Sequence, residues 1–483
     1  MPRNILLVCL TIALIFSATP GNAASDLPSV PFDSKIVDRL EVDRMYETIR
    51  FLSQSPREAG SPGENQAVAY LKNRFASYGY ETQAQSFPFA HYKEPTTLSL
   101  SVSGFEDVDW SLGSFHFGVN GEVTGELVDG GIGSESDLAG KDVSGKIVLV
   151  ARGVIPFADK ILNAAKAGAV GVIVYNNTPG ILHATLSAPD ERLIPAITIG
   201  QEQGNQLVKR LASGEKATAS FVVEGALTTL RTSHNVIAVR KPDTDEGTGQ
   251  IVIVSAHHDT VAGSPGANDD ASGIAITLEL ARVLADVPID TELRFITFGA
   301  EESSLMGSFA YVESLTDAER ERIVGVFQLD MVGSKDSGEL MMYTADGQKN
   351  LITDMAAVAS SHFSDVLHYG QEAGSDHLPF HLAGIPAGLF THAPREPWYH
   401  SPNDTIEHIS RDKIKQVAQI IGASVYEVAR PDTPAIEKVY RSPVTVDYPF
   451  DDRAIEDMAQ DNREQDNQAQ ERELPDRQVE MVP

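Results

Sequence analysis

From residue 232 onward, short apolar runs typical of strands alternate with longer segments that have helical periodicity. The strand-like runs are HNVIAVRK, GQIVIVSA, ELRFITFGA, IVGVFQLDMVG and PAGLFTH, and helical segments such as ASGIAITLELARVLADV and KIKQVAQIIGASVYEVA lie between or after them. Parallel neighbours in a sheet need a crossover connection, which is usually a helix. The alternation therefore predicts an α/β fold, in which a mostly parallel sheet is sandwiched by helices.

The character of the sequence changes between residues 94 and 226. Short β-rich runs such as LSLSVSG, GELVDGG and GKIVLVARG surround one Ala-rich helical segment, ADKILNAAKAGAVGVIVYNN. This stretch predicts an inserted β-rich domain, 94–226, which divides the larger domain into a first part at 24–93 and a second part at 227–431. The first part has helical periodicity over residues 36–80, followed by the strand-like run ETQAQSFPF.

The two ends of the chain differ from the rest in composition. In MPRNILLVCLTIALIFSATPGNAASD, one basic residue precedes an apolar run, and small residues follow it. This order predicts that residues 1–23 are a secretory signal peptide, whose apolar stretch is too short for a membrane span. Residues 451–483 carry 11 acidic and 4 basic side chains and almost no apolar ones, which predicts a disordered acidic tail over 432–483.

Cysteine content and net charge exclude several classes of site and partner. The single cysteine, Cys9, lies inside the predicted signal, so the mature chain can form neither disulfides nor cysteine-ligated zinc sites. The 68 acidic and 38 basic residues give a formal net charge of -30. Nucleic acid and anionic membranes bind cationic surfaces, so neither is expected as a partner. Because the mature chain has no cysteine, any metal must be bound by His, Asp and Glu.

Histidine and carboxylate side chains follow four of the strand-like runs. They are His257 and Asp259 after QIVIV, Glu301 and Glu302 after LRFITFGA, Asp330 after GVFQL, and His400 in WYHSPNDT after GLFTH. In an open α/β sheet the carboxyl ends of the strands form one edge, so these side chains are expected to meet there. Nitrogen and oxygen ligands of this mix suit zinc or another divalent transition metal. The set exceeds what one open zinc site requires. It predicts two ions that share a carboxylate, with a remaining glutamate as general base.

The loop SAHHDTVAGSPGANDDASG contains two adjacent histidines and three aspartates. Successive strand residues point to opposite faces, so His257 and Asp259 share one direction and His258 is expected to be structural. Asp270 is expected to cap the helix that follows.

Five motifs together resemble the two-zinc aminopeptidases of peptidase family M28. They are SAHHDTVAGSPGANDDASG, FGAEE, QLDMVGS, AGSDHLPFHLAGIPA and WYHSPNDT, and they occur in the order that the family has. Residues 94–226 resemble the protease-associated (PA) domain of secreted bacterial members. The resemblance covers nearly everything from residue 36 to about residue 430, and it implies the zinc-peptidase fold.

The resemblance implies a ligand set for each ion. One zinc ion would be held by His257, Asp269 and Asp330, and the second by Asp269, Glu302 and His400, so that Asp269 bridges the pair. The peptide bond after Asp269 is cis in the family. Asp376 and His377 in SDHLPF are expected only to shape the site, because the five family ligands are already placed.

The same matches imply the catalytic groups. Glu301 corresponds to the general base of the family, and Tyr399 to the phenol that stabilises the oxyanion. Asp259 corresponds to a carboxylate behind the metal ligands, which orients one ligating histidine and fixes its tautomer.

The resemblance therefore implies a secreted, zinc-dependent aminopeptidase that acts on peptides with a free N-terminus and holds two Zn²⁺ per chain. A monomer without membrane contact after signal removal is expected, and bound calcium is left open. A carboxypeptidase or dipeptidase of the same family is the alternative, although only Arg395 is available nearby to recognise a C-terminal carboxylate. A non-catalytic receptor-like protein, or a chain whose working part is a protein-binding PA domain, are further alternatives.

Overall fold

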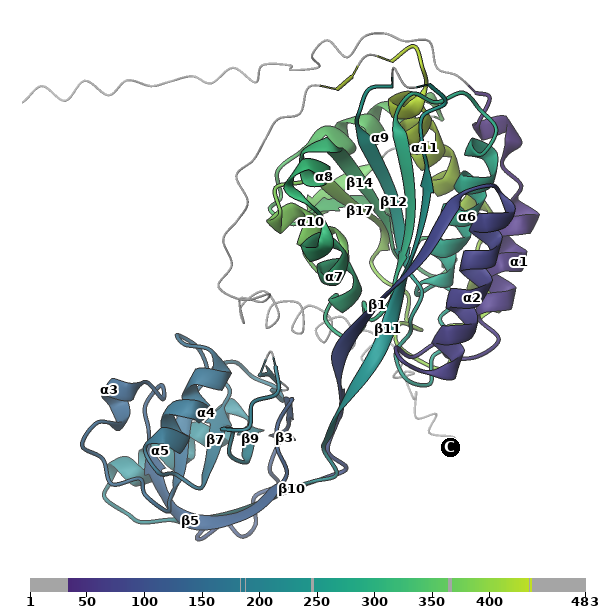
Figure 1. Cartoon of the computed structure of the whole chain (residues 1–483). Helices are drawn as coiled ribbons and strands as arrows, with labels where there is room; N and C mark the ends of the chain where they lie inside the picture. The colour runs from purple at the N-terminus through teal and green to yellow at the C-terminus, as the bar shows by residue number, and fades with distance from the viewer. Residues whose placement is uncertain are drawn as a thin grey trace, which may run out of the picture.

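The described residues form two domains, one built on an eight-stranded and the other on a seven-stranded β-sheet, which are joined by a long two-stranded ribbon (Figure 1). The computed structural model describes residues 34–182, 184–186, 188–244, 247–363, 367–433 and 435–436. The predicted signal peptide and nearly all of the predicted acidic tail lie outside the described residues. No helix within those ranges combines the length and apolar character that crossing a membrane requires.

The larger sheet has eight strands in the order β1-β11-β13-β12-β14-β17-β15-β16. Their bounds are Glu81–Lys93 (β1), Leu227–Arg240 (β11), Glu292–Phe298 (β13), Ile251–His257 (β12), Ile323–Leu329 (β14), Ala387–Ala393 (β17), Glu339–Thr344 (β15) and His368–Gln371 (β16). The central strands β13, β12, β14 and β17 are mutually parallel, whereas β11 and β15 run antiparallel to their central neighbours. The predicted mostly parallel sheet is confirmed, and β15 and β16 are strands that the sequence patterns did not indicate.

Helices cover both faces of this sheet (Figure 1). One layer is α1 (Val42–Leu52), α2 (Pro62–Ser77), α6 (Ala271–Leu284), α9 (Leu351–His362) and α11 (Arg411–Ala429), the other contains α7 (Met306–Ser314) and α10 (His377–Leu382), and α8 (Asp317–Arg322) precedes β14. Alternate residues of β12 face the two helix layers. Val252 and Val254 pack against the first layer, and Ile251 and Ile253 pack against the second. A strand buried on both faces reads as a nearly continuous apolar run, as the residues IVIV at the start of β12 do.

The ribbon consists of β1 and β11. These strands pair antiparallel from Glu81 opposite Val239 to Lys93 opposite Leu227. Only residues 236–240 of β11 also pair with β13, so the remaining length of the two strands extends beyond the larger sheet (Figure 1). Lys93 and Leu227 are therefore direct neighbours at the point where the chain enters and leaves the smaller domain.

The smaller domain is built on a seven-stranded sheet in the order β2-β10-β5-β6-β7-β9-β3. The strands are Thr97–Val102 (β2), Thr218–Glu224 (β10), Gly121–Asp129 (β5), Ile147–Ala151 (β6), Gly171–Tyr175 (β7), Ala196–Ile199 (β9) and Leu112–Gly113 (β3). The other elements are the strand pair Phe115–His116 (β4) and Ala184–Thr185 (β8) and the helices Glu135–Leu138 (α3), Phe157–Lys166 (α4) and Gln201–Ala212 (α5). Two apolar clusters of its own give this domain an independent core.

The helix expected within ADKILNAAKAGAVGVIVYNN covers only the first half of that segment. Helix α4 ends at Lys166, Gly168 follows with a φ of +90°, and the run GVIVY is strand β7. A short apolar run that is buried on both sides has no periodicity by which to separate strand from helix. Helix α5 was also not indicated by the sequence patterns.

Candidate metal centre

Four neighbouring strands bring the candidate ligands to one edge of the larger sheet. Strand β12 ends at His257, β14 ends directly before Asp330, β13 is followed by Glu301 and Glu302, and the loop after β17 carries His400. Because β13, β12, β14 and β17 are parallel, their carboxyl ends lie side by side. The structure thus places these side chains at the common edge that the sequence predicts.

Two groups of three side chains at this edge are compact enough to hold a metal ion each. The first is His257, Glu301 and Asp330, and the second is Asp269, Glu302 and His400. Within each group, one ligand atom from every residue lies within 4.8 Å of the other two. All five residues proposed as ligands from the sequence are therefore present, and Glu301 is next to them.

Asp269 lies between the two groups. Its Oδ1 is 3.0 Å from Nε2 of His257, and its Oδ2 is 3.3 Å from Nε2 of His400. The same two nitrogens are 3.5 Å from Oδ1 of Asp330 and 3.0 Å from Oε2 of Glu302, respectively. Asp269 therefore presents one carboxylate oxygen to each group, which is the geometry of a bridging ligand.

Several polar atoms at the centre are buried without a hydrogen-bond partner among the described residues. They are Nδ1 and Nε2 of His257, Oε1 of Glu302 and Oδ1 of Asp330. Buried polar atoms in proteins are nearly always hydrogen-bonded, so a cluster of unsatisfied ones needs a bound group to explain it. Imidazole nitrogen and carboxylate oxygen are zinc ligands, and the donor set therefore fits zinc.

Negative charge dominates the electrostatics of the centre. Burial alone would lower the pKa of His257, but the surrounding carboxylates, led by Glu301, raise that pKa well above its ordinary value. Burial likewise opposes protonation of His400, while Glu302 and Asp269 raise its pKa to about 10. Metal ligation needs neutral imidazole, so divalent cations and these protons compete for the same nitrogens. Bound cations and protonated histidines would both offset the negative charge of the carboxylates.

Asp259 connects two of the strand ends. Its carboxylate oxygens accept the backbone N–H groups of Glu301 at 3.0 Å and Glu302 at 3.2 Å. Its Oδ1 is also 3.7 Å from Nδ1 of His257, which is longer than a hydrogen bond. In the structure, Asp259 therefore holds the glutamate pair by direct hydrogen bonds and faces His257 across a wider gap.

Asp270 caps helix α6 and also connects it to two strands. Its carboxylate accepts the N–H of Gly273 in the first turn at 2.9 Å. It accepts the N–H groups of His257 at 3.3 Å and Met331 at 3.2 Å as well. The peptide bond between Asp269 and Asp270 is cis, as the resemblance to family M28 implies.

Asp404 is a functional candidate that the sequence reasoning missed. The two oxygens of this buried carboxylate accept the backbone N–H groups of Asn268 at 2.8 Å and Asp269 at 3.0 Å. The side chain of Asn268 in turn donates to Glu396 at 2.7 Å. Asp404 thus holds the backbone of Asp269 from outside its loop. Its place in the motif WYHSPNDT, four positions after His400, was the only signal available.

The other polar residues singled out from the sequence lie around the two groups. His258 hydrogen-bonds to a threonine hydroxyl of β13 through Nδ1, and its Nε2 lies 3.5 Å from Oε1 of Glu64, which supports a structural role. Asp376 accepts a serine hydroxyl of α7, and burial raises its pKa to about 8. His377 hydrogen-bonds to a backbone carbonyl at 2.7 Å. Ser375, which the sequence did not single out, donates to Oδ2 of Asp330 at 2.7 Å.

Tyr399 lies beside the second group. Its ring stacks on the imidazole of His400 with centroids 3.7 Å apart, and the guanidinium of Arg395 is 4.8 Å from its ring centroid. Arg395 also donates to Oε1 of Glu372 at 2.6 Å. Burial raises the pKa of Tyr399 well above its ordinary value. The phenol therefore keeps its proton and is able to donate a hydrogen bond.

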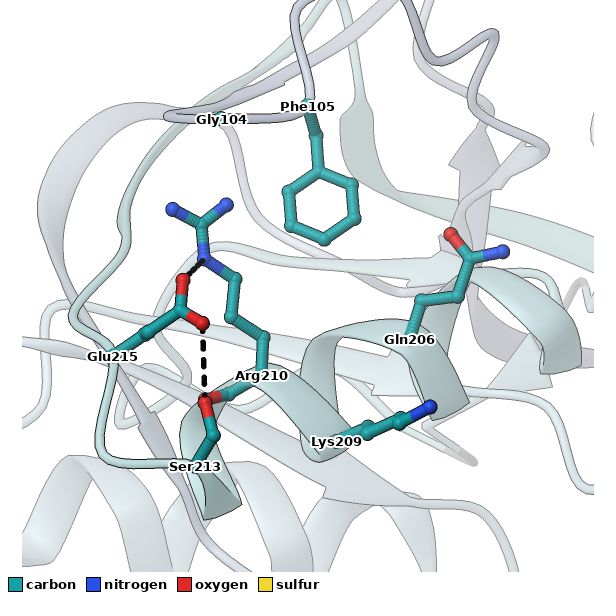
Figure 2. Close-up of a pocket in the computed structure, with 7 residues that line it drawn as sticks. All are labelled: Gly104, Phe105, Gln206, Lys209, Arg210, Ser213 and Glu215. Carbon is teal, nitrogen blue, oxygen red and sulfur yellow. Dashed lines mark hydrogen bonds and ion pairs between the residues drawn. The ribbon is translucent and has the colours of Figure 1, made fainter.

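A separate hollow lies in the smaller domain (Figure 2). Its volume is about 590 Å³, and it is lined by Gly104, Phe105, Gln206, Lys209, Arg210, Ser213 and Glu215. Nε of Arg210 is 3.3 Å from Oε2 of Glu215, and the guanidinium lies 5.1 Å from the ring centroid of Phe105. This hollow contains none of the candidate ligands, and its arginine is already paired.

Comparisons with known proteins match both domains. Residues 235–425 match peptidase family M28, and residues 123–207 match the PA domain. Aminopeptidase YwaD of Bacillus subtilis (strain 168) is 36% identical to this chain over 430 residues, which cover 86% of this chain and 90% of that protein.

Solved structures of aminopeptidases resemble the chain over most of its length. An aminopeptidase from Aneurinibacillus sp. strain AM-1 is 51% identical with a TM-score of 0.78, and the match covers 86% of this chain and 100% of that one. BSAP, described as a zinc aminopeptidase from Bacillus subtilis, is 34% identical with a TM-score of 0.60, and the match covers 81% of this chain and 96% of that one.

Replacing Asp404 with alanine should lower the affinity of the purified protein for zinc. The variant loses two hydrogen bonds that hold the backbone of Asn268 and Asp269, and groups behind metal ligands typically change metal affinity by about 10–100-fold. Competition with a chelator measures this affinity. Asp243 supplies the control. It lies between β11 and β12, and its carboxylate also accepts a backbone N–H group, that of Ile289 at 2.9 Å, but outside the loop that carries Asp269. Asp243→Ala should bind zinc like the wild type, and equal affinity in Asp404→Ala would contradict the assignment.

Proposed function

This chain belongs to peptidase family M28 and is a metallo-aminopeptidase, and from that premise we propose that it is a secreted two-zinc enzyme that removes N-terminal residues from peptides. The observation that carries the proposal is the position of Asp269. Its carboxylate oxygens lie 3.0 Å and 3.3 Å from Nε2 of His257 and His400. One carboxylate shared by two histidine-containing groups is what a pair of divalent ions requires.

Five residues are proposed as the zinc ligands. His257, Asp269 and Asp330 would hold one ion, and Asp269, Glu302 and His400 the other. When bound, a zinc pair stabilises negative charge on the reacting carbonyl oxygen and lowers the pKa of the attacking water. Proton transfer and hydrogen bonding to the substrate are proposed for side chains that surround these five.

Glu301 is proposed as the general base. Its carboxylate lies in the first group of ligand atoms, and burial raises its pKa well above the ordinary value. A carboxylate with raised proton affinity can take a proton from the attacking water and return it to the leaving amine. Tyr399, which keeps its proton, would donate a hydrogen bond to the carbonyl oxygen as negative charge develops there. Asp259 would position Glu301 through the N–H group that it accepts.

The charge of the centre supports a preference for a free N-terminus. Much of the α-amino group of a peptide is protonated near neutral pH, and the carboxylates at the sheet edge would attract it. Recognition of a C-terminal carboxylate would instead need an available cation. Arg395 donates to Glu372 at 2.6 Å and lies over Tyr399, which counts against a carboxypeptidase.

The test of this function is a comparison of free and blocked substrates before and after metal removal. Purified enzyme should contain close to two equivalents of zinc by elemental analysis and release arylamine from aminoacyl-arylamides. A chelator should abolish the activity and added zinc should restore it, whereas N-acetylated versions of the same substrates should stay intact. Cleavage of the acetylated and free substrates at equal rates would rule out an aminopeptidase, and a zinc content below one equivalent would rule out the two-metal centre.

Glu301→Gln should retain zinc but lose at least about a hundredfold in kcat, because the amide cannot accept the proton of the water. The zinc content of the variant should equal that of the wild type, which separates loss of a base from loss of a ligand. Glu302→Gln is the matched neighbour, and it should lose zinc as well as activity. Near-wild-type turnover in Glu301→Gln would show that another group is the base, and a loss of zinc would show that Glu301 is a ligand.

The domain organisation is also proposed. The segments are a signal peptide at 1–23, a peptidase domain at 24–93 and 227–431, an inserted PA domain at 94–226 and an acidic tail at 432–483. The direct pairing of Lys93 with Leu227 supports these insertion points, because an inserted domain needs adjacent ends in its host. The mature enzyme is proposed to act as a monomer.

Deleting residues 94–226 should leave the hydrolysis of small substrates largely intact. Lys93 and Leu227 face each other across the ribbon, so an Asn-Gly turn can join the two strands without changing their register. The comparison is kcat/KM for an aminoacyl-arylamide and for a long peptide, in the deletion variant and in the full chain. The full chain should discriminate more strongly against the long peptide. Loss of small-substrate activity in a folded, zinc-loaded deletion variant would mean that the insert contributes directly to the reaction.

A further inference from the structure

Arg57 is a buried arginine that touches the metal-binding loop from outside. It lies between α1 and α2, and only 2% of its surface is exposed. Its guanidinium donates to four backbone carbonyls, those of His258 at 2.8 Å, Leu52 at 2.9 Å, Pro265 at 2.7 Å and Gly266 at 3.1 Å. Three of these carbonyls belong to the segment that connects His257 to Asp269. Arg57 therefore binds this segment at both of its ends.

Two further contacts tie the same segments together. The backbone N–H of Arg57 donates to Oγ1 of Thr260 at 2.9 Å. The carbonyl of Gly266 accepts both Arg57 and the N–H of Ala271, the first residue of α6, at 3.2 Å. Gly266 has a φ of +63°, and a Cβ there would lie 2.4 Å from the carbonyl oxygen of Asp269 and 2.9 Å from Nη2 of Arg57. The close approach of Arg57 to the loop thus depends on a glycine.

The environment of Arg57 is unusual for a residue that only supports the fold. Within the part of the chain that the structure describes, no carboxylate forms an ion pair with its guanidinium, which donates to carbonyl oxygens instead. Burial lowers its pKa to about 10, against the opposing effect of Asp404, Asp259, Asp270 and Asp269. The group therefore stays charged at neutral pH. An apolar side chain often stabilises a fold as well as such a buried charge does, so stability alone does not account for it.

We propose that Arg57 is a positioning residue of the metal centre, which fixes the backbone between His257 and Asp269 so that Asp269 can bridge the two groups. This inference rests on the proposed two-zinc function. Among the described residues, Arg57 forms no hydrogen bond or ion pair with a ligand side chain, and it acts through the carbonyls of the loop. Asp404 acts on the same loop from the other side, where it accepts N–H groups. Arg57 supplies the donors and Asp404 the acceptors that hold one irregular segment.

The test compares zinc affinity, measured by chelator competition, in Arg57→Met, Arg57→Lys and the wild type, all shown to be folded by circular dichroism. Groups behind metal ligands change metal affinity by about 10–100-fold, so Arg57→Met should bind zinc at least about tenfold more weakly. Arg57→Lys should show a smaller loss, because one ammonium group keeps the charge but cannot reach four carbonyls at once. If Arg57→Met does not fold, Arg57→Lys decides the question by the same comparison.

Arg294 supplies the matched control. It is also a buried arginine of the peptidase domain, but it pairs with Glu292 at 2.8 Å near the start of β13, at the edge opposite the metal centre. Arg294→Met should lower the free energy of unfolding in urea without changing zinc affinity. Wild-type zinc affinity in the folded Arg57 variants would overturn the inference and leave the two-zinc function intact. A wild-type enzyme that binds no zinc would instead overturn the proposed function itself.

Discussion

Repulsion between buried carboxylates is the constraint on which the rest of this centre depends. Parallel strands end at one edge of the sheet, and the structure uses that edge to bring Asp269, Glu301, Glu302 and Asp330 into contact distance of two histidines. Anions that close together in a desolvated position are unstable unless positive charge lies between them. The raised pKa values of the histidines express this demand as bound protons. Two divalent cations meet the same demand with more charge, which is why the arrangement suits a metal pair and not a hydrogen-bonded core.

Four of the five candidate ligands, His257, Glu302, Asp330 and His400, can be located from the sequence because they follow strand-like runs, whereas Asp269 enters only through the resemblance to family M28. A fully buried strand such as β12 begins with a continuous apolar run, IVIV, and the polar ligand candidate His257 stands at its end. Strand parity then separates His257 from His258, and the structure agrees, since His258 bonds to a threonine of β13. Chain positions far apart converge because parallel strands share one carboxyl edge. The strand–helix alternation alone is enough to predict that these strand ends meet at one edge.

Arg57 and Asp404 could not be found in the same way. Their partners in the loop are backbone groups of residues 258–269, which lie more than one hundred positions away in the sequence and carry no side-chain signature of these hydrogen bonds. An arginine after a helix and an aspartate beside a turn are ordinary surface residues in a sequence, and only burial distinguishes these two. The strands β15 and β16 were missed for a related reason. They lie at the edge of the sheet, where β16 is largely exposed and lacks the apolar run that marks the central strands.

The glycine-rich loop explains why such distant residues are needed. Glycines allow the tight path from His257 to Asp269, as Gly266 shows with its positive φ and its close neighbours. That freedom carries an entropic cost, because a glycine-rich segment has more conformations to lose on folding than any other. The bridging role proposed for Asp269 nevertheless requires its carboxylate to be held within a fraction of an ångström, since both of its oxygens face a histidine nitrogen. Backbone hydrogen bonds from Arg57 on the carbonyl side and to Asp404 on the N–H side restrict the loop without occupying a ligand position. The loop can therefore be flexible by composition and fixed by its surroundings, which allows two proposed ligands, His257 and Asp269, in one short segment.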